Sequence, residues 1–182
     1  SFDFSGYDLV ISSSSAEAKG VITTTETLHL SYIHTPTRYY WSGYDDYVRS
    51  PGLGMMNPLA KKALPRVVKK MRLWDYAAAQ RPDVMIANST TVQERIQKYY
   101  QRDSVVIHPP VDTDRFGLSQ PKQGDYYLVV SRLIPYKRVD LAVQACTKLG
   151  KKLIVVGAGS ELKRLKSIAG PTVEFRGALP DK

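Results

Sequence analysis

The segment YYLVVSRLIPYKRVDLAVQACTKLGKKLIVVGAG, residues 126–159, decides which fold class the sequence predicts. It contains two short runs rich in β-branched residues, 127–130 and 153–156, each followed by a break. Strand, helix and strand in so short a span form a βαβ unit, which predicts a parallel sheet. The helix is indicated by apolar residues at helical spacing between the two runs: Val139, Ala142, Val143, Cys146 and Leu149.

The residues that follow the two predicted strands suggest an anion site. Parallel sheets bind ligands beyond the carboxyl ends of their strands. Arg132 and Lys137 follow the first strand, and Gly157 and Gly159 follow the second. Two cations beside a glycine-rich turn favour a phosphate, whereas the alternative is two solvated cations and a simple tight turn. The turn lacks the third glycine of the dinucleotide fingerprint, which excludes a nicotinamide site.

Composition and charge narrow the function classes. The chain has 182 residues, of which 43% are hydrophobic, so it can form a core; its net charge is +9. Such charge suits an acidic substrate, an anionic membrane face or nucleic acid, or simply a solvated basic surface. We expect no nucleic-acid partner, because the cations cluster at strand ends and on one helix without a recognised nucleic-acid motif.

Localisation is predicted from the cysteine content and the absence of targeting features. The single cysteine, Cys146, lies on the apolar stripe of a helix, where we expect it to fill the core. The sequence has no basic segment followed by a long apolar run and no apolar stretch long enough to span a bilayer. We therefore expect a cytoplasmic protein.

Strand and helix patterns alternate along the chain. The expected strands are residues 7–14 (buried), 27–33, 83–87, 105–108 and 172–175, besides the two above. The expected helices are 16–20, one begun by Pro36, 58–81 as one long helix or a broken pair with a kink at Pro65, one begun by the capping box 91–94, and 160–169. The inner stripe of the last helix is formed by Leu162, Leu165 and residues 168–169. Residues 42–57, rich in glycine and proline, are expected to form a loop.

The polar segment 111–125 separates two runs of β/α pattern. We assign residues 1–115 to the C-terminal part of one Rossmann-like domain and residues 126–182 to the N-terminal part of another, with residues 116–125 as the linker. Each half has too few strands for a complete doubly wound domain, so we expect an internal fragment of a larger protein.

Several motifs resemble one enzyme family. The motifs are SYIHTPTRYYW (31–41), VMIANSTTVQERIQKYYQR (84–102), VIHPPVDTDRF (106–116), YYLVVSRLIPYKRVDLAVQA (126–145), LIVVGAGSELKRLKSIA (153–169) and VEFRGALPD (173–181). Together they resemble retaining glycosyltransferases of the group 1 (family 4) type, and most closely the mannosyltransferase-like members. The resemblance implies the GT-B fold, in which two Rossmann-like domains face each other across a cleft. It also implies no metal and no cofactor.

The resemblance assigns roles to residues of the second domain. Arg132 and Lys137 match the Arg/Lys pair that holds the donor diphosphate. Gly157 and Gly159 would lie close to the donor, and Leu179 matches the turn whose backbone meets the nucleotide base.

The first domain would supply the catalytic histidine. His34 stands in the His-Thr-Pro setting of the family's histidine, near the donor sugar and the acceptor. Arg38 would lie on the acceptor side, where it can meet a phosphate; the aromatic residues 39–41 either stack on sugars or pack a helix. His29 lies inside a strand and is expected to be structural, and His108 is assigned no role.

The implied reaction moves a hexose, with mannose expected first, from GDP-mannose or a UDP-hexose to a glycan or lipid-linked acceptor. The family's later E-x7-E segment is not in this chain, so we expect the fragment to be inactive alone. The alternative is a non-catalytic nucleotide-binding module. The basic helix 58–81 either packs on its own domain with a solvated basic face or lies on an anionic membrane.

Overall fold

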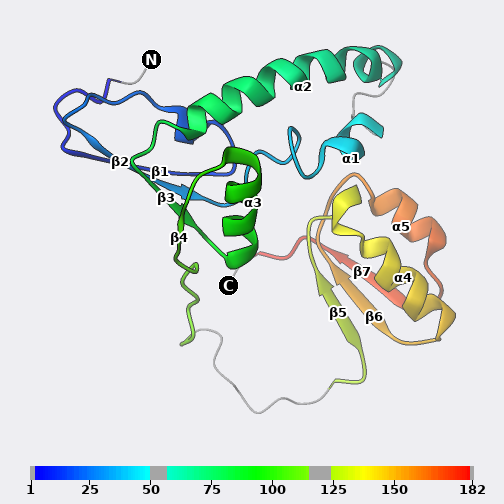
Figure 1. Ribbon diagram of the computed structural model, residues 1–182. Helices are drawn as coiled ribbons and strands as arrows, with labels where there is room; N and C mark the ends of the chain where they lie inside the picture. Colours follow the sequence, from blue (N-terminus) through cyan, green and yellow to red (C-terminus); the bar gives the residue numbers. More distant parts are fainter. Residues whose placement is uncertain (1–2, 50–56, 115–123, 181–182) are drawn as a thin grey trace. The chain divides into compact units, whose positions relative to one another are not determined.

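A computed structural model describes residues 3–49, 57–114 and 124–180. The chain divides into two compact units, Ser1–Asp112 and Thr113–Lys182. Each unit contains a parallel β-sheet accompanied by helices (Figure 1). The predicted α/β class with parallel strands is therefore confirmed, and both units are compatible with a Rossmann-like arrangement. Most of the expected linker, residues 116–123, lies outside the described residues.

The first unit has a four-stranded sheet in the order β1-β2-β3-β4, in which every neighbouring pair is parallel. Its strands are β1 (Leu9–Ser14), β2 (Leu28–Ile33), β3 (Val84–Ala87) and β4 (Val105–Val106). Its helices are the 3-10 helix η1 (Glu17–Gly20), α1 (Tyr44–Arg49), α2 (Asn57–Ala79) and α3 (Thr90–Tyr100).

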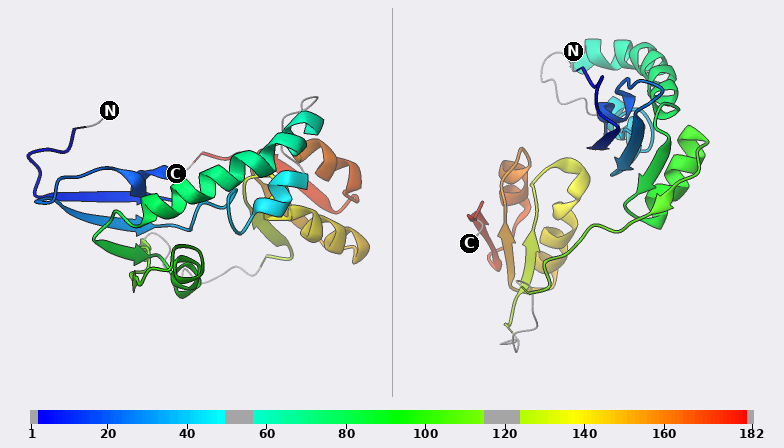
Figure 2. Two further views of the ribbon diagram at one scale, coloured as in Figure 1. Left: turned by 45° about the horizontal axis from the view of Figure 1, so that its top comes forward. Right: turned by 90° about the vertical axis from the view of Figure 1, so that its left-hand side faces the viewer.

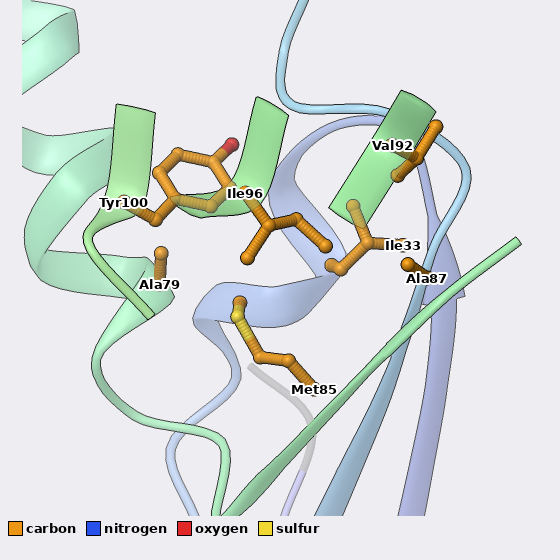
Figure 3. Close-up of a cluster of buried hydrophobic side chains, with 7 residues drawn as sticks. All are labelled: Ile33, Ala79, Met85, Ala87, Val92, Ile96 and Tyr100. Atoms are coloured by element: carbon orange, nitrogen blue, oxygen red, sulfur yellow. The ribbon is translucent and has the colours of Figure 1, made fainter. Parts of the chain in front are cut away.

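One face of this sheet packs against helices. Side chains of α3 and the end of α2 meet those of β2 and β3 (Figure 3). Burial of this apolar surface is the main favourable contribution to folding of the unit. The cluster consists of Ile33, Ala79, Met85, Ala87, Val92, Ile96 and Tyr100.

The opposite face of the same sheet stays exposed. Side chains alternate between the two faces of a strand, and in β1 Val10 and Ser12 are buried while Leu9 and Ile11 are 45% and 64% exposed. Leu28, in register with Leu9, is also exposed. The prediction of a buried strand is thus right for one face only, although parallel sheets usually have both faces covered.

One long helix follows the sequence prediction, and another differs from it. Of the two alternatives expected for residues 58–81, the structure shows the single long helix: α2 is continuous, with Pro65 inside it (Figure 2). Helix α3 begins earlier than its expected capping box, because Ser89 is the N-cap and its Oγ accepts a hydrogen bond from the Val92 N–H at 3.3 Å. A serine in extended conformation satisfies a free N–H of the first turn equally well, so the box at 91–94 is not needed.

The chain between β2 and α2 also departs from prediction. Pro36 does not begin a helix; turns follow it, and α1 begins only at Tyr44, within the expected loop. Residues 50–56 of that loop lie outside the described residues. Strand β4 is shorter than expected because pairing with β3 ends at Val106.

The second unit has a three-stranded parallel sheet in the order β5-β6-β7. Its strands are β5 (Tyr127–Val130), β6 (Leu153–Val156) and β7 (Val173–Gly177). Its helices are η3 (Pro135–Lys137), α4 (Val139–Lys148) and α5 (Leu162–Ile168).

The core of the second unit confirms most of the predicted helical stripes. Helices α4 and α5 both contribute to one buried cluster with β6, and Cys146 fills part of it, as expected. Leu149 is the exception: it lies just beyond α4 and is 69% exposed. The cluster consists of Leu133, Val139, Val143, Cys146, Leu153, Val155 and Leu165.

The two faces of the first sheet give a matched test. Ile33→Ala should reduce the free energy of unfolding by about 2–5 kcal/mol, since Ile33 is 2% exposed and its loss leaves a cavity. Ile11→Ala should cost about 1 kcal/mol or less, because Ile11 is exposed. Denaturant unfolding followed by tryptophan fluorescence reports on this unit, since Trp41 and Trp74 both lie in it. Equal losses in the two variants would show that both faces are covered.

Candidate functional site

Two loops at the carboxyl ends of β5 and β6 are joined through their backbones. Ser131 N–H donates to the Val156 carbonyl at 3.0 Å, and Leu133 N–H donates to the Ala158 carbonyl at 2.9 Å. The Leu133 carbonyl in turn accepts from Glu161 N–H at 2.9 Å. Parallel pairing therefore continues past the strands, and the segment carrying Arg132 is fixed against the glycine turn.

Glycine is required at two positions of this turn. A Cβ at Gly157 would overlap the Ser131 carbonyl oxygen, and a Cβ at Gly159 would overlap the Leu133 carbonyl oxygen. Gly157 also has φ +139°, a backbone conformation that residues with a Cβ rarely adopt. Its N–H donates to the Gly177 carbonyl at 2.7 Å. The two glycines thus serve the close approach of the loops, and the Gly157 N–H is already used within the protein.

Arg132 and Lys137 are exposed cations beside this turn. No carboxylate among the described residues pairs with either of them. The Lys137 ammonium lies 5.7 Å from the centre of the Tyr136 ring, a distance typical of a cation–π contact. Both charges therefore remain open to an anion that approaches the carboxyl ends of the strands.

Two other arginines of this unit differ from Arg132 and Lys137 because each is paired with a carboxylate. Arg138 is exposed, but its guanidinium donates to both oxygens of Asp140 at 3.0 and 3.1 Å. This hydrogen bonding lowers the pKa of Asp140 below its usual value. Arg164 pairs with Glu161 at 2.5 Å. Arg138 and Arg164 are therefore paired with carboxylates, whereas Arg132 and Lys137 are not paired with any in the described part of the chain.

Leu179 is exposed near the end of the described chain. It follows Gly177, which has φ +70° and accepts the hydrogen bond from the glycine turn. The backbone near Leu179 is thus tied to the same edge of the second sheet as Arg132 and Lys137.

In the first unit, His34 directly follows β2 and is exposed. Its N–H donates to the Ser14 carbonyl at 3.0 Å, which continues the pairing of β1 with β2. Its Nε2 lies 2.9 Å from Ser13 Oγ, and its ring meets the edge of Tyr32 at 5.7 Å between centroids. The imidazole is therefore held at the carboxyl edge of the sheet, where a ligand can reach it.

The residues after His34 mostly pack inward. Arg38 is half-buried, and Tyr40 is buried. Trp41 stacks on Tyr99 with ring centroids 5.1 Å apart, and the Tyr39 hydroxyl donates to Glu17 at 3.0 Å. Burial and the hydrogen bond to Glu17 raise the pKa of Tyr39. Of the two alternatives for these aromatics, the structure shows packing.

His29 is structural, as expected. It is fully buried, and its Nε2 lies 2.9 Å from Ser12 Oγ, which also donates to Ser31 at 2.9 Å. Burial lowers the pKa of His29, an effect that the nearby Asp83 charge partly opposes. His108, given no role, lies with Nδ1 3.2 Å from the Asn88 carbonyl oxygen.

Sequence reasoning missed a buried ion pair near His34. Lys19 and Asp75 are 1% and 0% exposed, and Lys19 Nζ lies 2.6 Å from the Asp75 carboxylate. A signal was present, because Asp75 lies seven residues after Val68 and four before Ala79, on the buried stripe of α2. A carboxylate on such a stripe needs a partner. The sequence did not indicate that the partner would be Lys19.

Cavities and metal-ligand groups do not single out another site. One hollow lies at the end of α3 and the start of β4, on the edge opposite His34; its lining includes Gln93, Gln97, Lys98, Arg102 and Ser104. No group of three His, Cys, Asp or Glu side chains in the described parts is placed to hold a metal ion. None of the described helices is both long and apolar enough to cross a bilayer.

Comparison with known proteins assigns no family. No protein-family model matches the chain, and no curated protein matches it either. A functional assignment therefore has to rest on the residues and the geometry described above.

The close approach of the two loops predicts a difference between two glycines. Gly150→Ala should cost about 1–2 kcal/mol, because Gly150 has φ +61° but open space around its Cα. Gly157→Ala should cost more, since its φ is also positive and its methyl group would displace the Ser131 carbonyl. Amide hydrogen exchange at Val155 and Val156 measures both effects. Equal losses of protection would contradict the requirement for close contact.

Proposed function

We propose that this chain carries parts of both domains of a retaining glycosyltransferase with the GT-B fold. The enzyme moves a hexose, with mannose as the first candidate, from GDP-mannose or a UDP-hexose to a glycan or lipid-linked acceptor. The observation that carries the proposal is the pair Arg132 and Lys137, exposed and without a carboxylate partner among the described residues, beside a loop locked by glycines. A nucleoside diphosphate is the anion that this arrangement suits.

The two cations have complementary roles in the proposed reaction. Negative charge develops on the diphosphate as its bond to the anomeric carbon breaks. Arg132 can hold two phosphate oxygens with its planar guanidinium, while Lys137 supplies a mobile point charge. Because these contacts strengthen as charge develops, they stabilise the transition state more than the bound donor.

His34 and Arg38 would act on the sugar and the acceptor. The exposed His34 imidazole can hydrogen-bond the donor sugar or the leaving group, and Arg38 can meet an acceptor phosphate. In front-face transfer, the acceptor oxygen bonds to the anomeric carbon on the side that the phosphate leaves. The acceptor hydroxyl proton passes to the departing phosphate oxygen, so configuration is retained.

Nucleotide binding tests the role of Arg132. Arg132→Ala should weaken GDP or UDP binding by about 1.5–3 kcal/mol, the contribution of a hydrogen bond to a charged group. Lys148→Ala is the matched control, since it removes one positive charge at the far end of α4. Isothermal titration calorimetry measures both variants. Unchanged affinity in Arg132→Ala contradicts the diphosphate site. Nucleotide binding without sugar transfer by this chain agrees both with an inactive fragment of a transferase and with the alternative of a non-catalytic nucleotide-binding module.

Helix α2 supports a second part of the proposal, a peripheral contact with the inner face of the cell membrane. One side of the helix packs inward at Val68 and Ala79, as the alternative of a helix packed on its own domain implies. Arg72 also turns inward, with its guanidinium 4.7 Å from the Tyr44 ring centre. The side chain of Lys61 lies outside the described residues.

The outward face of α2 is nevertheless cationic. Its exposed basic residues recur at three- and four-residue spacing, and the only acidic residue of the helix, Asp75, is buried. Leu73, 69% exposed, lies on the same side of the helix. A contact of this kind is mainly electrostatic and is therefore sensitive to salt. The exposed basic residues are Lys62, Arg66, Lys69 and Lys70.

Vesicle binding tests the membrane contact. Reversing two charges with Lys69→Glu and Lys70→Glu should abolish binding to phosphatidylserine vesicles at low salt, since each basic residue near the surface contributes roughly 1 kcal/mol. Lys151→Glu with Lys152→Glu, in the second unit, is the control with the same change in net charge. Cosedimentation at low and high salt measures the effect. Equal binding by the two double variants would show that α2 is not the contact.

A further inference from the structure

Asp75 accepts four hydrogen bonds in the interior of the first unit. Its carboxylate is fully buried, and each oxygen is contacted by two donors. All four distances are 2.8 Å or shorter, at or below the usual length of hydrogen bonds between such groups. The donors are Lys19 Nζ at 2.6 Å and Thr37 Oγ1 at 2.8 Å to Oδ1, and Trp41 Nε1 at 2.7 Å and the Tyr100 hydroxyl at 2.8 Å to Oδ2.

The donors come from three separate segments. Lys19 belongs to η1, which follows β1. Thr37 and Trp41 belong to the segment that follows β2, and Tyr100 ends α3. Lys19 also donates to the Ala16 carbonyl at 2.7 Å. Through one carboxylate on α2, the chain beyond the first two strands is therefore tied to both long helices.

The hydrogen bonds to Asp75 orient the groups that donate them, and this role differs from adding stability. Replacing a buried ion pair with apolar side chains often leaves stability unchanged or improves it, so the pair is weak evidence for a stabilising role. An ionised carboxylate only accepts, and the planar Trp41 ring gives its N–H a fixed direction. The network is therefore satisfied in one conformation of the segment from Pro36 to Trp41, and a shift of this segment would leave a buried charge with fewer partners.

The segment held by this network, from Pro36 to Trp41, follows His34 closely and contains Arg38. Thr37 is three residues after His34 and one before Arg38. The Thr37 carbonyl accepts from Tyr40 N–H at 3.0 Å and from Trp41 N–H at 3.2 Å, which closes the turn. Whatever fixes Thr37 therefore also fixes the direction in which the chain leaves His34 and presents Arg38.

We propose that the Asp75–Lys19 pair is a positioning device that holds the turn after β2, and with it His34 and Arg38, in the conformation needed for sugar transfer. The part of this inference that concerns transfer rests on the proposed function. Asp75 and Lys19 are buried and touch no substrate, so they are positioning residues and act through Thr37 and Trp41.

The double variant Lys19→Met with Asp75→Asn tests the inference, because it removes both charges together and leaves no unpaired buried charge. Only Trp41 and Trp74 give indole N–H resonances, and Trp74→Phe assigns them. The Trp41 indole proton should move upfield when its carboxylate acceptor is replaced. Amide exchange at Tyr40, Trp41 and Gly43 should accelerate on the order of tenfold or more, as loss of a charge-assisted hydrogen bond implies.

Amides in the core of the unit separate positioning from general stability. Met85 and Ile96 lie in the hydrophobic cluster, and their exchange should stay as in the unmodified chain. Acceleration of all these amides together would mean that the pair only stabilises the unit, and no change in either set would mean that it does not hold the turn. Either result overturns the proposal.

A milder variant covers the case in which the double variant does not fold. Thr37→Val removes one donor at the turn and leaves the Lys19–Asp75 pair in place. Thr35→Val is its control, since Thr35 bonds to Arg95 and not to Asp75. Faster exchange at Tyr40 and Trp41 in Thr37→Val alone supports the proposal, and equal rates in the two variants overturn it.

The test of this inference can fail or succeed independently of the test of the proposed function. The exchange and indole measurements need no substrate, and Arg132 and Lys137 lie in the other unit. The variants should therefore bind GDP as the unmodified chain does. If the unmodified chain binds no nucleotide, the proposed function fails while the positioning of the turn is judged on its own data.

Discussion

Parallel strand pairing is the constraint on which the candidate site depends. In both units every neighbouring pair of strands is parallel, so all carboxyl ends of a sheet meet at one edge. Arg132 follows β5, the glycine turn follows β6, and His34 follows β2. Each is therefore delivered to the edge where open α/β sheets bind ligands. An antiparallel hairpin would have placed half of these residues at the opposite edge.

The two units hold their loops at this edge by different physical means. In the second unit the loops are joined by backbone hydrogen bonds, and glycines allow the approach. In the first unit the turn after β2 is held by side chains that converge on Asp75. The first solution depends on the absence of a side chain at Gly157, whereas the second depends on a charge in a low-dielectric interior.

Sequence periodicity predicted the features that depend on the local sequence. It did not predict the features that depend on contacts between residues far apart in the chain. The strands, their parallel pairing, the stripe of α5 at Leu165 and the burial of Cys146 follow from local pattern. The exposed side of β1 does not, because alternation identifies two faces but not which face is covered. The Lys19–Asp75 pair joins residues far apart in sequence, and a lysine in a short helix looks like any solvated cation. The open state of Arg132 was likewise visible only once the partners of its neighbours were known.

Net charge alone therefore says little about where an anion would bind to this protein. Arg138 and Arg164 carry the same charge as Arg132, but carboxylates two and three residues away pair with their exposed guanidinium groups, and ion pairs near the surface contribute little to stability. Such pairing engages Arg138 and Arg164, whereas Arg132 and Lys137 have no carboxylate partner among the described residues. Under the proposed function, a diphosphate that approaches the carboxyl edge of the second sheet would meet these two cations.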